Sequence, residues 1–167
     1  MNRMRITKGQ AVLLTTLFLT LAFIFIQSSL PPSASGSEID AVGGAMGKIF
    51  SADSNFGAFL QRNVSNIAHF CEYGVLGAQI SIGIFMWFNE RLRWSAVSLF
   101  AAVSVSFLDE SVQILSGRHA SVVDMWIDVF GYSVFYLLTT LIFAIIRRKK
   151  SKATTALGES NGKNNRC

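Results

Sequence analysis

Charged residues are scarce in this chain, and their scarcity bears first on the class of protein. Lys, Arg, Asp and Glu make up only 15% of the 167 residues, whereas a soluble domain of this size carries about a quarter. There are only two prolines, and the two cysteines, Cys71 and Cys167, show no metal-ligand spacing. Hydrophobic residues reach 51%, with 14 Phe and a mean hydropathy of +0.42. This balance excludes an ordinary soluble domain and indicates a protein of the lipid bilayer.

Four segments are apolar and long enough to cross the hydrocarbon core, which takes about 20 helical residues. They cover residues 11–30, 67–88, 95–115 and 123–146. The first carries no charge and ends at Pro31-Pro32, which cannot continue a helix. We therefore predict an all-α polytopic membrane protein, in which residues 1–150 form a bundle of four transmembrane helices.

The positions of Lys and Arg predict the orientation. Most of them precede the first span, fill the turn between the second and third, or follow the fourth: Arg3, Arg5, Lys8, Arg91, Arg93, Arg147, Arg148, Lys149, Lys150 and Lys152. Both termini are then cytoplasmic, and Cys71 and Cys167 lie on opposite sides of the membrane, so we expect no disulfide between them. The net charge of +5 is concentrated at these sites. Because no zinc-finger or RNA-binding motif accompanies it, we expect no nucleic-acid partner.

The segments outside the spans leave some alternatives open. Residues 31–66 form an extracytoplasmic loop, which is either an interfacial helix on the membrane surface or irregular. Residues 151–167 are polar and are expected to be a disordered cytoplasmic tail. The first span, with its basic start and the small residues 33–35, also fits a secretory signal peptide. Cleavage near Gly36 would leave three helices in the same orientation.

Polar residues interrupt three of the four spans at one common depth. In the predicted orientation they fall in the outermost turns of the second, third and fourth helices and in the loop that follows the third. Our candidates for a ligand-binding pocket are His69, Glu72, Tyr73, Asp109, Glu110, Gln113, Arg118, Asp124 and Asp128. Spacings of three and four residues place each set on one helix face. Because an acid near mid-bilayer costs about 2.5–3.5 kcal/mol, we expect these faces to turn inward and to line one outward-open pocket.

Several details of this pocket can be predicted. Asp109 and Glu110 are adjacent, so we expect Asp109 to face the pocket and Glu110 to point elsewhere. Arg118 is interpreted as a counter-ion for Asp124 or Asp128. Three glycines would allow close helix approach: Gly74, Gly77 and Gly131.

Acids outnumber bases in the predicted pocket by five to two. Some carboxyl groups stay protonated or pair internally, or a divalent cation binds among the oxygen ligands, or a cationic or hydroxyl-rich ligand enters. The sequence alone leaves these alternatives open and assigns no cofactor, no metal ligand and no catalytic residue. None of the four predicted spans contains a nucleophile motif such as G-x-S-x-G.

Together these motifs resemble the VanZ-like family of bacterial membrane proteins, named for a teicoplanin-resistance protein. The matching pieces are "QSS" at the end of the first span, "HFCEYGVLG" from His69, "DESVQ" from Asp109, and "GRHASVVDMWIDVFG" from Gly117. The chain differs from the usual pattern at Ser65 and Asn66, where members often carry a basic pair, and at Val112, where they often carry His.

The resemblance implies a small helical protein of the bacterial cytoplasmic (inner) membrane, linked to glycopeptide, chiefly teicoplanin, susceptibility. Our first hypothesis is a pocket that engages an envelope lipid, a cell-wall precursor or a lipophilic glycopeptide. The second is a membrane-embedded hydrolase or transferase for a lipid-linked substrate, with or without a metal. The third is a structural subunit of a membrane assembly. The oligomeric state is not predicted.

Overall fold

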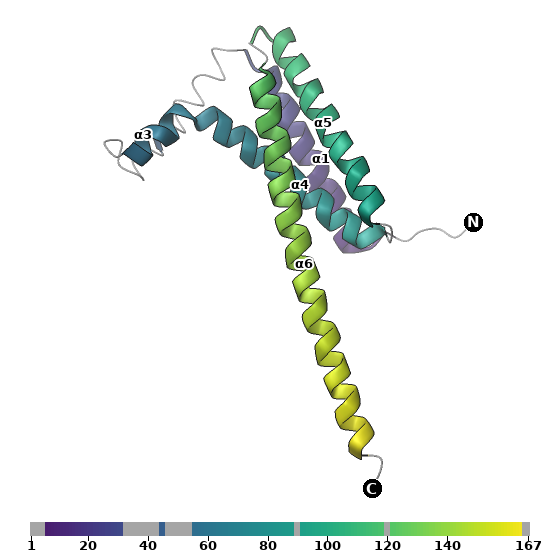
Figure 1. Ribbon diagram of the computed structural model, residues 1–167. Coiled ribbons are helices and arrows are strands. Elements are labelled where there is room, and N and C mark those ends of the chain that lie inside the picture. Colours follow the sequence, from purple (N-terminus) through teal and green to yellow (C-terminus); the bar gives the residue numbers. More distant parts are fainter. Residues whose placement is uncertain (1–5, 32–43, 46–54, 89–90, 119–120, 165–167) are drawn as a thin grey trace, which may run out of the picture.

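The computed structural model is a bundle of long helices (Figure 1). It describes residues 6–31, 44–45, 55–88, 91–118 and 121–164, and among these all side chains except those at 61, 91–92 and 150–164. The cleavage site near Gly36, His119, Cys167 and most of the loop at 31–66 lie outside the described residues.

Four helices are long and apolar enough to span a membrane. They are α1 (Lys8–Ser29), α4 (Val64–Trp87), α5 (Arg91–Leu115) and α6 (Val122–Asn164). Every predicted span lies on one of these helices, to within the capping residue at its end. The predicted all-helical fold with four spans is confirmed, and no strand occurs among the described residues.

Local sequence explains where α1 begins and ends. The Thr7 hydroxyl accepts a hydrogen bond from the backbone N–H of Gln10, and the Gln10 side chain accepts one from Thr7 N–H, which together form a capping box. At the other end, Leu30 leaves the helix in an extended conformation, because Pro31 disfavours helical dihedrals in the residue before it.

Two segments outside the spans are helical. α3 (Asn55–Arg62) precedes α4 by a single residue and leaves Phe56 and Phe59 exposed, as expected for an interfacial helix. α6 continues as helix to Asn164, which differs from the disordered tail expected from Ser151 onward. The apolar span supplies the costly helical nucleus, so the polar residues beyond it add to an existing helix.

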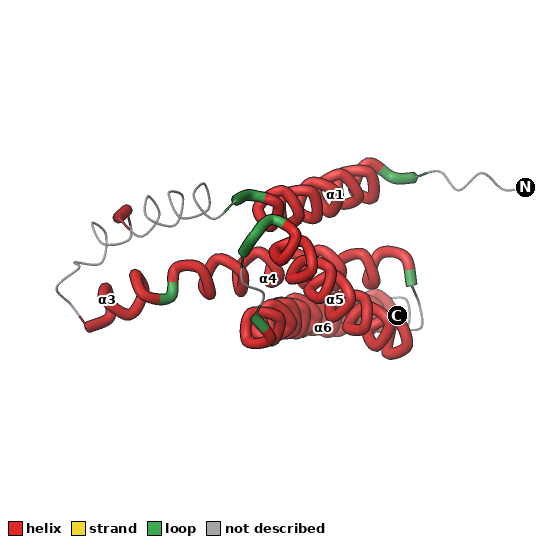
Figure 2. The backbone as a smooth tube through the Cα atoms, turned by 90° about the horizontal axis from the view of Figure 1, so that it is seen from above, coloured by secondary structure: helices red, strands yellow, loops and turns green. Residues whose placement is uncertain are grey.

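The most extensive interface joins α4 and α6. A β-carbon at Gly77 would overlap the backbone carbonyl of Tyr132, and one at Gly131 would overlap that of Phe70. Gly74 lies against the ring of Phe135. The close approach predicted for these glycines is confirmed. α5 packs against α6 and α1, and α1 also contacts α4 (Figure 2).

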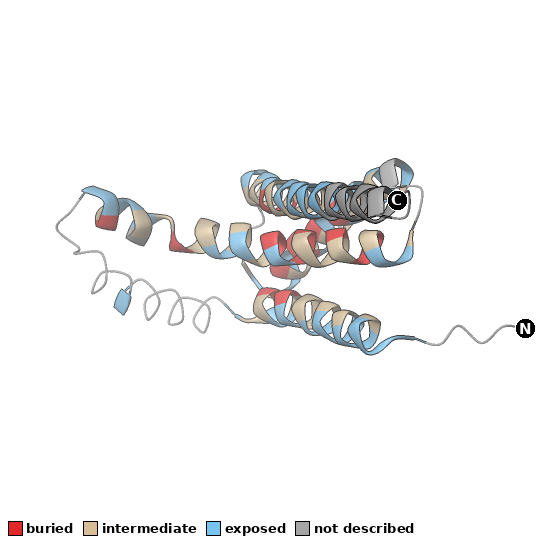
Figure 3. Cartoon of the chain, turned by 90° about the horizontal axis from the view of Figure 1, so that it is seen from below, coloured by how far each residue is buried: buried red, intermediate tan, exposed pale blue. Residues whose placement is uncertain are grey.

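The distribution of side chains is the reverse of that in a water-soluble protein. Large apolar residues such as Phe18, Phe100 and Phe130 are 64–75% exposed, whereas Asp109 and Asp128 are 0% exposed. Figure 3 shows the buried positions of the four spans mainly along the faces where these helices meet, while Gly57 on α3 and Val64 at the start of α4 are also buried. This arrangement suits a bundle whose solvent is lipid.

Candidate functional site: a buried polar centre

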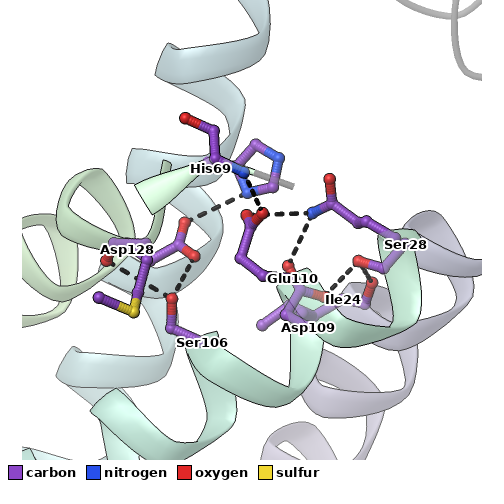
Figure 4. A network of polar contacts seen from close by, with 10 residues as sticks. Ile24, Ser28, His69, Ser106, Asp109, Glu110 and Asp128 are labelled. Carbon is purple, nitrogen blue, oxygen red and sulfur yellow. Dashed lines mark hydrogen bonds and ion pairs between the residues drawn. The ribbon is translucent and has the colours of Figure 1, made fainter. Parts of the chain in front are cut away.

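Polar side chains from all four spans meet near one end of the bundle (Figure 4). Ser28 comes from the last turn of α1, His69 from the second turn of α4, Asp109 from the end of α5 and Asp128 from the second turn of α6. We call the following set the polar centre: Ser28, His69, Ser106, Asp109, Glu110, Gln113 and Asp128. Basic residues such as Lys8 and Lys149 lie far from the polar centre, at the other ends of the first and fourth spans.

Asp128 joins α6 to α5 and α4. Its Oδ2 accepts a hydrogen bond from the Ser106 hydroxyl at 2.6 Å. Its Oδ1 lies 3.2 Å from Nδ1 of His69, which is 13% exposed. Asp128 is therefore held on one oxygen while the other faces the imidazole.

Asp109 joins α5 to α1. Its Oδ1 accepts a short hydrogen bond from the Ser28 hydroxyl, and its Oδ2 accepts one from Gln113 Nε2 at 3.2 Å. Ser28 itself is only 3% exposed. The prediction that Asp109 points inward agrees with this geometry.

Glu110 also turns inward, contrary to our expectation that it would point elsewhere. Its Oε1 accepts a hydrogen bond from Gln113 Nε2 at 3.4 Å, and its Oε2 accepts one from the backbone N–H of Ser121 at 2.8 Å. The longer Glu side chain reaches sideways to the start of α6, so two adjacent acids both contribute to the interior.

Tyr73 and Glu72 border the polar centre. Tyr73 is 0% exposed, and its ring belongs to the apolar core with Ile24 and Leu76. Its hydroxyl interacts electrostatically with Asp109 and Asp128. Glu72 interacts with His69 and faces a mainly apolar groove of about 480 Å³ between α1 and α4. The other residues that line this groove are Leu19, Thr20, Phe23, Cys71 and Val75.

Arg118 and Asp124 lie at the edge of this arrangement. The Arg118 guanidinium donates to the Gln27 carbonyl at 3.5 Å, and it makes no ion pair within 4 Å with Asp124 or Asp128 in the described part of the chain. The counter-ion role expected for Arg118 is therefore not observed. Gly117, with φ of +81°, turns the chain toward α1 at this point.

Ser28 and Ser106 are the polar-centre residues that the sequence did not single out. Serines are common in apolar helices and usually bond to the carbonyl of the preceding turn, as Ser104 and Ser111 do here. The "QSS" of the first span was noted only as part of the family resemblance. An acid at the same predicted depth on a neighbouring helix is the signal that could have found both serines.

The side chains of the polar centre are of the kinds that would hold a positively charged, hydroxyl-bearing or metal ligand. It concentrates carboxylate oxygens and one imidazole in a region closed to water, where electrostatic interactions are strong. His69, Asp109 and Asp128 each offer one ligand atom, and these atoms lie within 4.8 Å of one another.

Comparison with known proteins gives one match. The family model described as VanZ/LLP1 matches residues 11–144, which include all four spans and the whole polar centre. No curated protein and no solved structure matches the chain.

Proposed function

Because the chain belongs to the VanZ/LLP1 family and is a multi-pass membrane protein, we propose that it lowers teicoplanin susceptibility in the bacterial envelope. In this proposal the polar centre binds the head of an envelope lipid, a cell-wall precursor or the glycopeptide itself. Access of teicoplanin to its membrane-bound target is thereby reduced.

The burial of Asp109 and Asp128 carries the proposal. Two fully buried acids in a membrane protein are costly, and intramembrane ionisable groups generally mark a functional site. With both termini cytoplasmic, as the Lys and Arg positions predict, the polar centre lies in the outer leaflet. There it would face cell-wall precursors and glycopeptides.

The groove beside Glu72 supports a lipophilic ligand. It joins an apolar surface on α1 and α4 to a carboxylate that interacts with His69. An acyl chain would occupy the groove, and an amino or hydroxyl group of the head would bond to the acids.

Expression in a teicoplanin-susceptible host tests this proposal. We expect the protein to raise teicoplanin tolerance more than vancomycin tolerance, and Asp128→Asn or Arg118→Ala to abolish the effect. Asp124→Asn, which alters an acid one turn earlier on α6, is the matched control and should keep it. Unchanged tolerance with the wild-type protein confirmed in the membrane would refute the proposal.

A second function is favoured by the grouping of His69, Asp109 and Asp128. A metal held there would activate water against a lipid-linked substrate and make the protein a hydrolase or transferase. Incubation of the purified protein with lipid-linked envelope precursors distinguishes the two: an enzyme releases product, whereas a binding protein leaves the precursors intact.

A further inference from the structure

Three potential metal-ligand atoms lie close together on three different helices. They belong to His69 on α4, Asp109 on α5 and Asp128 on α6, and they fall within 4.8 Å of one another. Metal–ligand bonds of about 2.0–2.2 Å place neighbouring ligand atoms about 3.0–3.5 Å apart. The 3.2 Å between His69 Nδ1 and Asp128 Oδ1 matches this spacing, and the Asp109 ligand atom lies within 4.8 Å of both.

Unpartnered polar atoms supply an independent indication of a ligand. The Tyr73 hydroxyl is buried and makes no hydrogen bond of acceptable geometry, and Asp128 Oδ1 lies 3.2 Å from His69 Nδ1 in a contact that is not a well-formed hydrogen bond. Asp128 and Tyr73 are both 0% exposed, and the Tyr73 hydroxyl interacts electrostatically with Asp109 and Asp128. Buried polar atoms without good hydrogen bonds are costly, and a cation between His69 Nδ1 and Asp128 Oδ1 would bind both.

The surroundings of the two acids orient them for such a role. Ser106 holds the far oxygen of Asp128 at 2.6 Å and leaves Oδ1 toward His69. Ser28 and Gln113 hold Asp109 by one hydrogen bond to each of its oxygens, and each oxygen keeps a second lone pair for a metal ion. Hydrogen bonds of this kind fix the direction of metal-binding carboxylates and strengthen metal binding.

Charge and donor type indicate the class of ion. Two carboxylates that are fully buried against one imidazole leave a negative excess, which a divalent cation would cancel. Mg²⁺ and Ca²⁺ prefer shells made of oxygen alone, whereas imidazole together with carboxylate suits transition metals.

We propose that His69, Asp109 and Asp128 bind one Zn²⁺ or Mn²⁺ ion, which links α4, α5 and α6. Three protein ligands leave at least one coordination position for water or for an oxygen of a ligand head group. This inference does not depend on a role in teicoplanin tolerance.

The experiment measures metal in the full chain, purified in detergent through a tag without histidines. Metal content is determined by inductively coupled plasma mass spectrometry, before and after chelation and reloading with Zn²⁺, Mn²⁺, Mg²⁺ or Ca²⁺. We expect one Zn²⁺ or Mn²⁺ per chain. Asp109→Asn and Asp128→Asn should lower the affinity at least about tenfold, and Ser106→Ala should lower it by a similar factor, because it loosens a ligand without removing it.

Asp124→Asn is the matched control and should bind metal as the wild type does. Gel filtration identifies variants that fail to fold, and thermal unfolding of the wild type provides a readout free of mutation. The melting temperature should fall on chelation and recover with Zn²⁺ or Mn²⁺ but not with Mg²⁺.

Two outcomes would overturn the metal site. One is a well-folded wild type that takes up less than about a tenth of an equivalent of every ion after reloading, where a filled site gives one. The other is equal binding by the wild type, Asp109→Asn and Asp128→Asn. A wild type that confers teicoplanin tolerance but binds no metal would refute this inference alone, whereas a wild type that binds metal but confers no tolerance would refute only the proposed function.

Discussion

The two faces of α4 are joined to their neighbours by different forces. Toward α6, the helices touch along the glycine seam, formed by Gly74, Gly77 and Gly131, where backbone packs on backbone. Toward α1, only Ile24 and Ser28 of that helix are buried, and hydrogen bonds accompany the apolar packing of Ile24, Leu17 and Leu21. We call these contacts the α1 junction. Its hydrogen bonds are Ser28 to Asp109, Gln79 to Thr20 at 3.0 Å, Ser116 to the Ser28 carbonyl at 2.9 Å, and Arg118 to the Gln27 carbonyl at 3.5 Å.

The difference shows two ways in which helices can associate inside a membrane. Lipid is as apolar as leucine, so apolar burial gives helices little reason to associate in a membrane. Close backbone packing provides the attraction at the glycine seam, and hydrogen bonds shielded from water provide it at the α1 junction. We therefore expect the seam to respond to added volume and the junction to respond to lost polarity.

Gly77→Ala should have the largest effect on stability. Its β-carbon would overlap the Tyr132 carbonyl, and because that neighbour is backbone, α4 and α6 must separate, at a cost of about 3 kcal/mol. Thermal unfolding in detergent measures this loss of stability. Gly9→Ala is the control, since its β-carbon would lie 3.6 Å from Met86 in ordinary contact. Equal melting temperatures for the two variants would contradict the claim that close packing at the glycine seam stabilises the bundle.

Asp109→Ala should come second. It removes the acceptor for Ser28 and Gln113 and loosens α1, with a loss of about 2 kcal/mol, because hydrogen bonds to charged groups are the stronger ones. A disulfide engineered between positions 20 and 79 should then form more slowly. If cross-linking is unchanged and unfolding is as in the wild type, the polar bonds do not hold α1.

Ser28→Ala should have a smaller effect, about 1 kcal/mol, in the range measured for hydrogen bonds between membrane helices. Ser29→Ala is the matched control, because the Ser29 hydroxyl bonds only to the Phe25 carbonyl of its own helix. Unfolding in the same detergent compares them. A Ser29 variant as destabilised as the Ser28 variant would show that the effect belongs to α1 itself.

Arg118→Ala should have the smallest effect on stability, below about 0.5 kcal/mol, because the hydrogen bond from its guanidinium to the Gln27 carbonyl is long and only partly buried. The same variant is expected to lose teicoplanin tolerance. Loss of tolerance at an unchanged melting temperature would show that Arg118 contributes to function and not to the α1 junction. A large drop in melting temperature would contradict this prediction.

Much of the fold could be predicted because membrane helices follow simple rules. Length and hydropathy located the four spans, and Pro31-Pro32 marked the end of the first. Helical spacing placed His69, Asp109 and Asp128 on inward faces at one depth. The glycines on α4 and α6 indicated where the helices approach one another.

The rest depended on details that periodicity does not contain. Helical spacing treats Asp109 and Glu110 as facing different ways, yet the extra methylene of Glu110 lets it reach the backbone of Ser121. Charge complementarity predicted an acid beside Arg118, but the turn at Gly117 brings it to a carbonyl of α1. Ser28 and Ser106 carry no charge, so the sequence did not identify them. Only the structure shows their hydrogen bonds to Asp109 and Asp128.

The hydrogen bond between Ser28 and Asp109 spans 81 residues of sequence, and this separation bears on how the chain is made. At about 5–20 residues per second, several seconds pass between the synthesis of the donor and that of its acceptor. α1 and α4, which carry Ser28 and His69, are synthesised first. Both helices are therefore already in the bilayer when α5 leaves the ribosome with its two acids. The order of synthesis thus provides partners before the costly groups arrive, and α6 closes the assembly last.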